Sequence, residues 1–179
     1  YLSDNNIDVK IICLSNQVII KKNINRKIKV INLNKKRLIN SIFPILKIIN
    51  TTKPDILFSS LLHISIFLCF FKRINFIKPK LFIRPSNVIL LSHKAAQNIT
   101  NYLIISLTRF CLKYADLFFC ISEDIYKELR LFKIPTKKIV KINNAIVDND
   151  FYLKSKKPLK KDKRLNKTDY ILSIGRLTE

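Results

Sequence analysis

Glycine is nearly missing from this sequence, and methionine and tryptophan are absent altogether. The 179 residues contain one glycine, Gly175. A chain with no start methionine and almost no glycine is typical of a fragment, so we expect the true N-terminus to lie before Tyr1. Hydrophobic residues make up 48% of the chain, which is enough for a packed core and argues against a disordered protein.

Acidic residues are also scarce. The sequence has 12 Asp and Glu against 34 Lys and Arg, which gives a formal net charge of +22. Such a chain attracts polyanions, among them nucleic acid, anionic lipid surfaces and phosphorylated ligands. Lys, Ile and Asn are abundant together, however, as in proteins encoded by AT-rich genomes. Both explanations of the charge, an anionic partner and codon usage, remain open.

No cysteine pair has the C-x-x-C spacing, and no cysteine–histidine pattern suits zinc. His63 and His93 stand alone, and we interpret both as structural or exposed residues. The cysteines lie in apolar runs at irregular spacing, which predicts buried, reduced thiols in a cytosolic protein and no metal site. These cysteines are Cys13, Cys69, Cys111 and Cys120.

A full transmembrane span is missing as well. The longest apolar stretch, 56–71, is shorter than a bilayer span and contains Ser59, Ser60, His63 and Ser65. A strand followed by a buried helix explains this stretch better than a membrane helix.

Short apolar runs alternate with segments of helical periodicity along most of the chain. Strands are expected at 9–14, 28–33, 55–60, 81–84, 117–121 and 138–142. Helices are expected at 38–50, 61–72 and 97–113 and after Ser122, and a loop at 86–94; Pro44 fits the first helix only if that helix begins near Ser41. This order predicts an α/β fold, a Rossmann-like parallel sheet with helices on both faces.

The segment after 117–121 has the clearest local pattern. Ser122 is a good N-cap, and Glu123 and Asp124 place carboxylates where the helix dipole favours negative charge. Ile125, Leu129 and Phe132 then form an apolar stripe with helical spacing.

The composition changes after Phe151, where lysines crowd a segment with little apolar content. Like charges repel and keep such a segment extended. We therefore expect a Rossmann-like N-terminal domain at 1–151 and a basic linker at 152–169. The apolar run at 170–174, followed by Gly175 and Arg176, predicts the first strand of a second domain. We expect residues 170–179 to be the start of this domain, which is truncated.

Several motifs follow one another in a fixed order. They are PDILFSS (54–60), IRPSN (83–87), YADLFFCIS (114–122), KIVKINNAIVDNDF (138–151) and YILSIGRLTE (170–179). Each is modest alone, but the ordered set resembles the N-terminal half of family-4 glycosyltransferases of the GT-B fold. That fold has two Rossmann-like domains that face each other across a cleft, and the resemblance covers nearly the whole chain. It implies that residues 1–151 are the acceptor-side domain and that the first strand of this domain precedes Tyr1.

The resemblance implies roles for particular residues. Gly175 and Arg176 match the turn whose arginine binds the donor diphosphate, a task that suits a permanently charged, planar guanidinium. Arg84, Ser86 and Asn87 match an Arg-x-Ser/Asn run on the acceptor side, although Pro85 stands where relatives often have an acidic residue. A strand-terminating turn explains Arg84 to Asn87 equally well, and both interpretations remain open.

Three further residues match positions near the cleft. Ser122 and Glu123 correspond to the family's Ser-Glu at a helix start, where capping is the expected role. Asn144 corresponds to the asparagine of an Asn-Gly-Val-Asp or Asn-Pro-Val-Asp turn, with Ala145 in place of the glycine or proline, and is expected to order the crossing into the linker. No residue can be assigned a catalytic role from the sequence.

The resemblance implies a retaining glycosyltransferase, of the hexosyltransferase type, acting in cell-surface polysaccharide biosynthesis. It would move a sugar from a nucleotide-sugar, its donor substrate, to a hydroxyl of a lipid-linked or polysaccharide acceptor, with no cofactor and no metal. The fragment alone is expected to be inactive. We expect it in the cytoplasm, peripheral at the inner face of the membrane, where anionic lipid meets its basic surface.

The alternative function is a basic nucleic-acid-binding module, and the net charge motivates it. No helix-turn-helix spacing, zinc pattern or aromatic RNA-binding signature accompanies the charge, so no specific nucleic-acid partner is expected.

Overall fold

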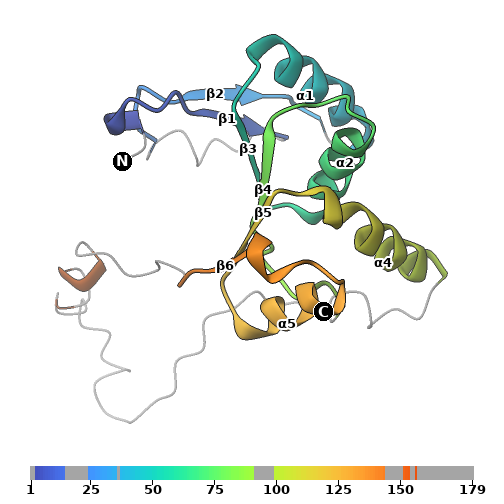
Figure 1. Ribbon diagram of the computed structural model, residues 1–179. Coiled ribbons are helices and arrows are strands. Elements are labelled where there is room, and N and C mark those ends of the chain that lie inside the picture. Colours follow the sequence, from blue (N-terminus) through green and yellow to red (C-terminus); the bar gives the residue numbers. More distant parts are fainter. Residues whose placement is uncertain are drawn as a thin grey trace, which may run out of the picture. The chain divides into compact units, whose positions relative to one another are not determined.

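The computed structural model describes residues 3–14, 24–35, 37–90, 99–143, 151–153 and 156. The chain divides into two compact units, 1–143 and 144–179. The first unit holds every strand that is described, and in the second unit residues 151–153 are helical (Figure 1). The predicted strand at 170–174 and almost all of the predicted linker lie outside the described residues.

The strands form two parallel sheets. Their bounds are β1 Lys10–Cys13, β2 Lys29–Asn32, β3 Ile56–Ser59, β4 Lys80–Ile83, β5 Leu117–Cys120 and β6 Ile139–Lys141. β1 pairs with β2, and the larger sheet has the order β3-β4-β5-β6. Because every pairing in the larger sheet is parallel, each connection between its strands must cross over the sheet, and a described helix lies in each of these connections.

Helices α1, α2, α4 and α5 lie in the first unit (Figure 1). Their bounds are α1 Ile39–Thr52, α2 Leu62–Arg73, α4 Ile99–Cys111 and α5 Glu123–Leu131. Short 3₁₀ turns occupy Ser3–Asn5, Leu112–Tyr114 and Thr136–Lys138. A parallel sheet flanked by helices is a Rossmann-like α/β arrangement, so the predicted fold class is confirmed.

Two details of the helices differ from expectation. α1 begins at Ile39 rather than near Ser41, so Pro44 lies inside it and removes one backbone hydrogen bond. The expected loop at 86–94 is wrong in its middle, because residues 89 and 90 are helical. A carboxylate from α5 accepts from both of their amides, a contact between distant residues that local sequence patterns do not contain.

The larger sheet has one well-buried face. Leu81, Ile83, Phe118 and Cys120 are each 2% exposed or less and form the centre of the core. Helix α2 packs there, since Ser65 on its first turns bonds to the inward-facing Ser59 of β3. The buried apolar side chains therefore hold these strands together, so that the carboxyl ends of β3, β4 and β5 lie side by side at one edge of the sheet.

The opposite face of that sheet is also apolar but more open. Phe119 contacts both Phe58 and Phe82, with ring centroids 6.0 and 5.9 Å apart. Phe58 is 59% exposed, although its two neighbours are half-buried.

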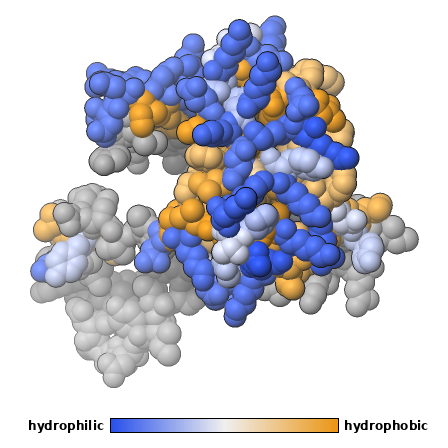
Figure 2. All heavy atoms as spheres, viewed as in Figure 1, coloured by the Kyte–Doolittle hydropathy of each residue, from blue (hydrophilic) through white to orange (hydrophobic). Residues whose placement is uncertain are grey.

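Exposed apolar side chains also occur on the helices. Leu103, Leu107 and Phe110 share one face of α4, and all three are exposed. On α1, Ile39 and Phe43 face solvent. Figure 2 shows hydrophobic side chains, in orange, gathered over α1 and α2 beside hydrophilic ones in blue.

Candidate functional site

The candidate site lies where β3 and β4 end. These strands are parallel neighbours with Ser59 opposite Ile83, and the Arg84 backbone N–H donates to the Ser59 carbonyl at 2.9 Å. The chain then continues as Ser60 from one strand and as Arg84 to Asn87 from the other. Ligands of open parallel sheets bind at this carboxyl edge, because loops from adjacent strands meet there.

A pocket of about 260 Å³ opens between these two loops. It combines hydroxyl, amide and imidazole groups with an apolar base. The lining residues are Ser60, Leu62, His63, Ser65, Ile83, Pro85, Ser86, Asn87, Ile89 and Leu112. Such a mixture suits a ligand that has both hydroxyl groups and an apolar surface.

The wall from α2 is held by buried hydroxyls. Ser59 Oγ and Ser65 Oγ lie 2.9 Å apart, and Ser65 Oγ also lies 2.9 Å from the Leu61 carbonyl, to which it donates. Both serines are buried, whereas His63 on the same helical turn is exposed. The helix start is therefore fixed from inside, and the imidazole is accessible at the mouth of the pocket.

Two of the three predicted acceptor-side residues line this pocket. Ser86 and Asn87 are exposed at its rim, and Pro85 forms part of its buried wall. Arg84 is half-buried and is not among the lining residues, although its backbone joins β3 to β4. The assignment of all three residues to acceptor binding stays a prediction.

The sequence interpretation missed Ser60 and His63. The signal was present, because Ser60 directly follows β3 and His63 lies in the first turn of α2. Both positions belong to the same sheet edge as Ser86 once the parallel order of the strands is known. His63 was interpreted as structural or exposed, and it is an exposed residue that lines the pocket.

Ser122 and Glu123 lie at the carboxyl end of β5 and are not part of the pocket lining. Ser122 Oγ accepts from the Ile125 backbone N–H at 3.3 Å, which is the capping geometry. Glu123 accepts from Lys141 Nζ at 2.6 Å, and this hydrogen bond lowers the pKa of the Glu123 carboxyl. Both side chains are thus engaged in the local structure around α5.

The remaining predicted site residues cannot be placed. Asn144, Gly175 and Arg176 lie outside the described residues. Their roles at the domain crossing and at the donor phosphates therefore stay predictions.

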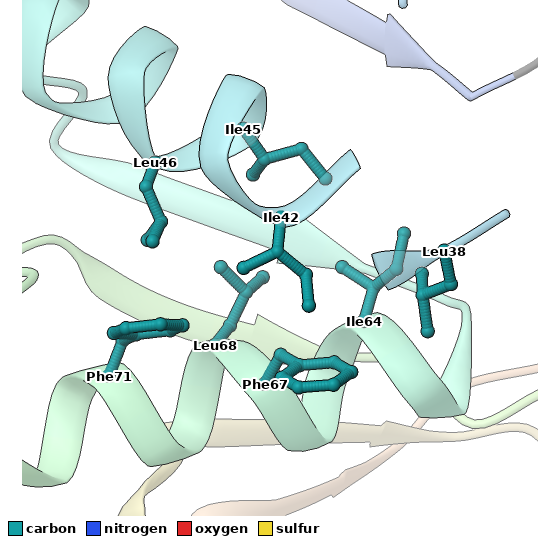
Figure 3. A pocket seen from close by; sticks show the side chains of 8 residues that line it. All are labelled: Leu38, Ile42, Ile45, Leu46, Ile64, Phe67, Leu68 and Phe71. Carbon is teal, nitrogen blue, oxygen red and sulfur yellow. The ribbon is translucent and has the colours of Figure 1, made fainter. Parts of the chain in front are cut away.

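A second cavity lies between α1 and α2, and Figure 3 shows its lining side chains converging from both helices. All eight are apolar: Leu38, Ile42, Ile45, Leu46, Ile64, Phe67, Leu68 and Phe71. The cavity volume of about 10 Å³ has room for no more than a single water, and the lining offers that water no polar partner. We interpret this cavity as a packing seam between the helices.

The four-stranded parallel sheet flanked by helices defines a Rossmann-like domain, the kind that forms each half of a GT-B fold, and the pocket lies at the carboxyl edge of this sheet. A family model described as Glycosyltransferase Family 4 matches residues 1–149. The chain therefore belongs to glycosyltransferase family 4, as its sequence motifs predicted. A search of curated proteins gives no match.

Proposed function

We propose that this chain supplies the acceptor-binding half of an enzyme that transfers a sugar from a nucleotide-sugar to an acceptor hydroxyl. The observation that carries the proposal is the pocket between Ser60–Ser65 and Pro85–Asn87. Hydroxyl and amide side chains can exchange hydrogen bonds with sugar hydroxyls, while Leu62 and Ile83 can contact the carbon face of a sugar ring. Its 260 Å³ is just below the usual range for small-molecule sites, about 300–1,000 Å³, which suits a single sugar unit.

The donor side is assigned by the family resemblance. Arg176, next to Gly175, would bind the diphosphate and stabilise the charge that develops on the leaving group. Basic side chains and a helix N-terminus can perform this task, so the proposed reaction uses neither metal nor cofactor. Retention of the anomeric configuration and transfer of a hexose are further parts of the proposal.

The exposed apolar side chains and the positive charge of the protein fit a lipid-linked or polysaccharide acceptor. Tyr102 and Leu103 on α4 are 79% and 63% exposed, and the chain carries a net charge of +22. Exposed apolar groups and basic residues together favour docking on an anionic membrane face. No helix in the described part of the chain is long and apolar enough to cross a membrane. A peripheral location on the cytoplasmic face is part of the proposal, and the basic charge and exposed apolar groups support it.

Calorimetric titration with hexyl glycosides of glucose, galactose and mannose tests the pocket. At least one glycoside should bind, and Ser86→Ala and Asn87→Ala should each weaken binding by about fivefold to tenfold, the value of one lost hydrogen bond. Asn50→Ala is the matched control, because Asn50 is exposed on α1 and does not line the pocket. Equal loss of affinity in the control, or no binding at all, would contradict the proposal.

A sugar-transfer assay tests the proposal that this chain supplies only the acceptor-binding half of the enzyme. With nucleotide-sugars and an alkyl glycoside acceptor, the 179-residue chain alone should show no sugar transfer, because its described strands all belong to one unit, whereas a GT-B enzyme binds donor and acceptor between two Rossmann-like domains. Turnover by the chain alone would overturn this part. Tight, salt-dependent binding of one nucleic-acid sequence would favour the alternative function suggested by the charge.

A further inference from the structure

Glu128 is a buried carboxylate that the proposed function does not use. It lies in α5 directly before Leu129 and three residues after Ile125, on the apolar side of the helix, and it is 3% exposed. A carboxylate buried in this way is costly unless it accepts hydrogen bonds that replace its water. Its position therefore requires partners that make burial favourable.

The partners are two successive backbone amides far away in the sequence. Glu128 Oε2 accepts from the Ile89 N–H at 2.8 Å, and Oε1 accepts from the Leu90 N–H at 2.5 Å. Each oxygen thus has a donor, and hydrogen bonds to a charged acceptor are shorter and stronger than neutral ones. The pair fixes the backbone at 89–90 against α5.

This contact belongs to one wall of the pocket. Ile89 is itself a lining residue, and Ser86 and Asn87 lie three and two residues before it. At the other end of the same segment, the Arg84 N–H is bonded to the Ser59 carbonyl. The turn that carries Ser86 and Asn87 is therefore tied to β3 at its start and to Glu128 at its end.

We propose that Glu128 is a positioning residue, which holds Ser86 and Asn87 in place at the pocket from a different helix. It touches no ligand, and its effect on binding passes through the backbone of 84–90. The inference rests on the proposed function for the nature of the ligand, but the mechanical link between Glu128 and the turn can be measured without any ligand.

The rival explanation is that Glu128 only stabilises the fold. The two explanations differ in what a substitution disturbs. A positioning residue controls local opening of the turn, whereas a stabilising residue changes the opening of the whole domain and every core amide with it.

Amide hydrogen exchange, followed by NMR on the full 179-residue chain, separates these explanations. Glu128→Gln keeps one carbonyl oxygen but points an NH₂ group at the other amide. One of the Ile89 and Leu90 amides should then exchange at least about tenfold faster, as for a buried donor left unpaired. The Ser86 and Asn87 signals should shift, and the core Phe118 amide should keep its wild-type rate.

The matched control is Asp124→Asn, which makes the same charge change on the same helix at an exposed position. It should leave exchange at Ile89 and Leu90 within about twofold, as for surface substitutions in general. Equal acceleration of the Phe118 amide in Glu128→Gln, with unshifted Ser86 and Asn87 signals, would overturn the proposal. If Glu128→Gln does not fold, Glu128→Asp takes its place, since it keeps the charge but shortens the side chain by one methylene group; the same exchange rates and signals then support or overturn the proposal.

Binding supplies the second readout. A hexyl glycoside that binds the wild-type chain should bind Glu128→Gln at least about fivefold more weakly, measured at a temperature where both proteins are folded. The affinity falls because a mobile turn loses conformational entropy when the ligand orders it. Unchanged affinity would contradict positioning. If the wild-type chain binds no glycoside, the acceptor assignment fails, while the exchange and shift data still decide the role of Glu128.

Discussion

The Asp116 carboxylate lies 2.9 Å from the Lys72 ammonium and accepts a 2.6 Å hydrogen bond from the Leu81 backbone N–H. Lys72 Nζ also donates to the Pro79 carbonyl at 2.7 Å. These contacts join the end of α2 to the amino ends of β4 and β5, at the sheet edge opposite the pocket. Burial tends to raise the pKa of Asp116, but the hydrogen bonds from Lys72 and Leu81 and the charges of Lys72 and Lys138 outweigh it, so the pKa lies below its usual value.

This lowered pKa predicts a particular loss of stability in acid. A carboxyl whose pKa is lower in the folded state stabilises the protein above the unfolded-state value of about 3.9, and the contribution disappears as the pH falls through the folded-state value. Asp116→Ala should lower the free energy of unfolding at pH 7 by about 1 kcal/mol, a discounted figure because the side chain is 37% exposed.

Urea denaturation at pH 7 and pH 3 checks this prediction. The wild-type protein should lose more stability between the two values than Asp116→Asn does, since the variant has no proton to bind at that position. Identical losses would show that Asp116 does not contribute to the acid dependence.

The N-cap of α5 gives a second prediction. Ser122 Oγ accepts from the Ile125 N–H at 3.3 Å, a long hydrogen bond, so Ser122→Ala should cost about 0.5–1 kcal/mol of unfolding free energy. Ser122→Asn should recover most of it, because asparagine is an equally good capping residue. Thermal or urea denaturation of the three proteins decides, and equal stability of all three would contradict the capping role.

The cysteines give a third prediction. Burial raises the pKa of Cys69 to about 12 and that of Cys120 to about 11, and it also raises the pKa of the buried Cys111. The thiolate is the reactive form, so these thiols should react slowly with Ellman's reagent in the native protein at pH 8. Cys13 is only half-buried and should react first. One fast thiol in the native state and four after denaturation are expected, and four fast thiols in the native state would contradict the buried sites.

The exposed face of α4 gives a fourth prediction, on membrane docking. Leu103→Glu should reduce sedimentation with anionic vesicles containing phosphatidylserine, because it removes an apolar contact and adds a repelled charge. Leu131→Glu on α5 is a matched control, since Leu103 and Leu131 are both 63% exposed. Equal effects of the two substitutions, or no preference of the wild-type chain for anionic over neutral vesicles, would contradict the proposal that this face docks on a membrane.

The sequence predicted the elements well where the pattern is local. The apolar runs located β3, β4 and β5 within a residue or two, and Ser122 located the start of α5, because strand hydrophobicity and capping depend on neighbouring residues. The stripe of Ile125, Leu129 and Phe132 is buried as its helical spacing indicated.

Contacts between residues that lie far apart in the chain could not be predicted from the sequence. Nothing near Glu128 indicates that its partners are the amides at 89–90, so that segment was interpreted as a loop and Glu128 was not recognised at all. The pocket was found only in part for the same reason. Ser86 and Asn87 carried a family motif, whereas His63 became visible only when the parallel sheet brought the ends of β3 and β4 together.

The most direct test of the acceptor pocket is an NMR titration of the isotopically labelled chain with a binding hexyl glycoside and, separately, with UDP-glucose. The glycoside should shift the amide signals of His63, Ser86 and Asn87 and leave the signals at the amino ends of β4 and β5 unchanged. UDP-glucose should leave the three pocket signals in place. A glycoside that shifts none of the three, or a nucleotide-sugar that shifts them all, would contradict the assignment of this pocket to the acceptor.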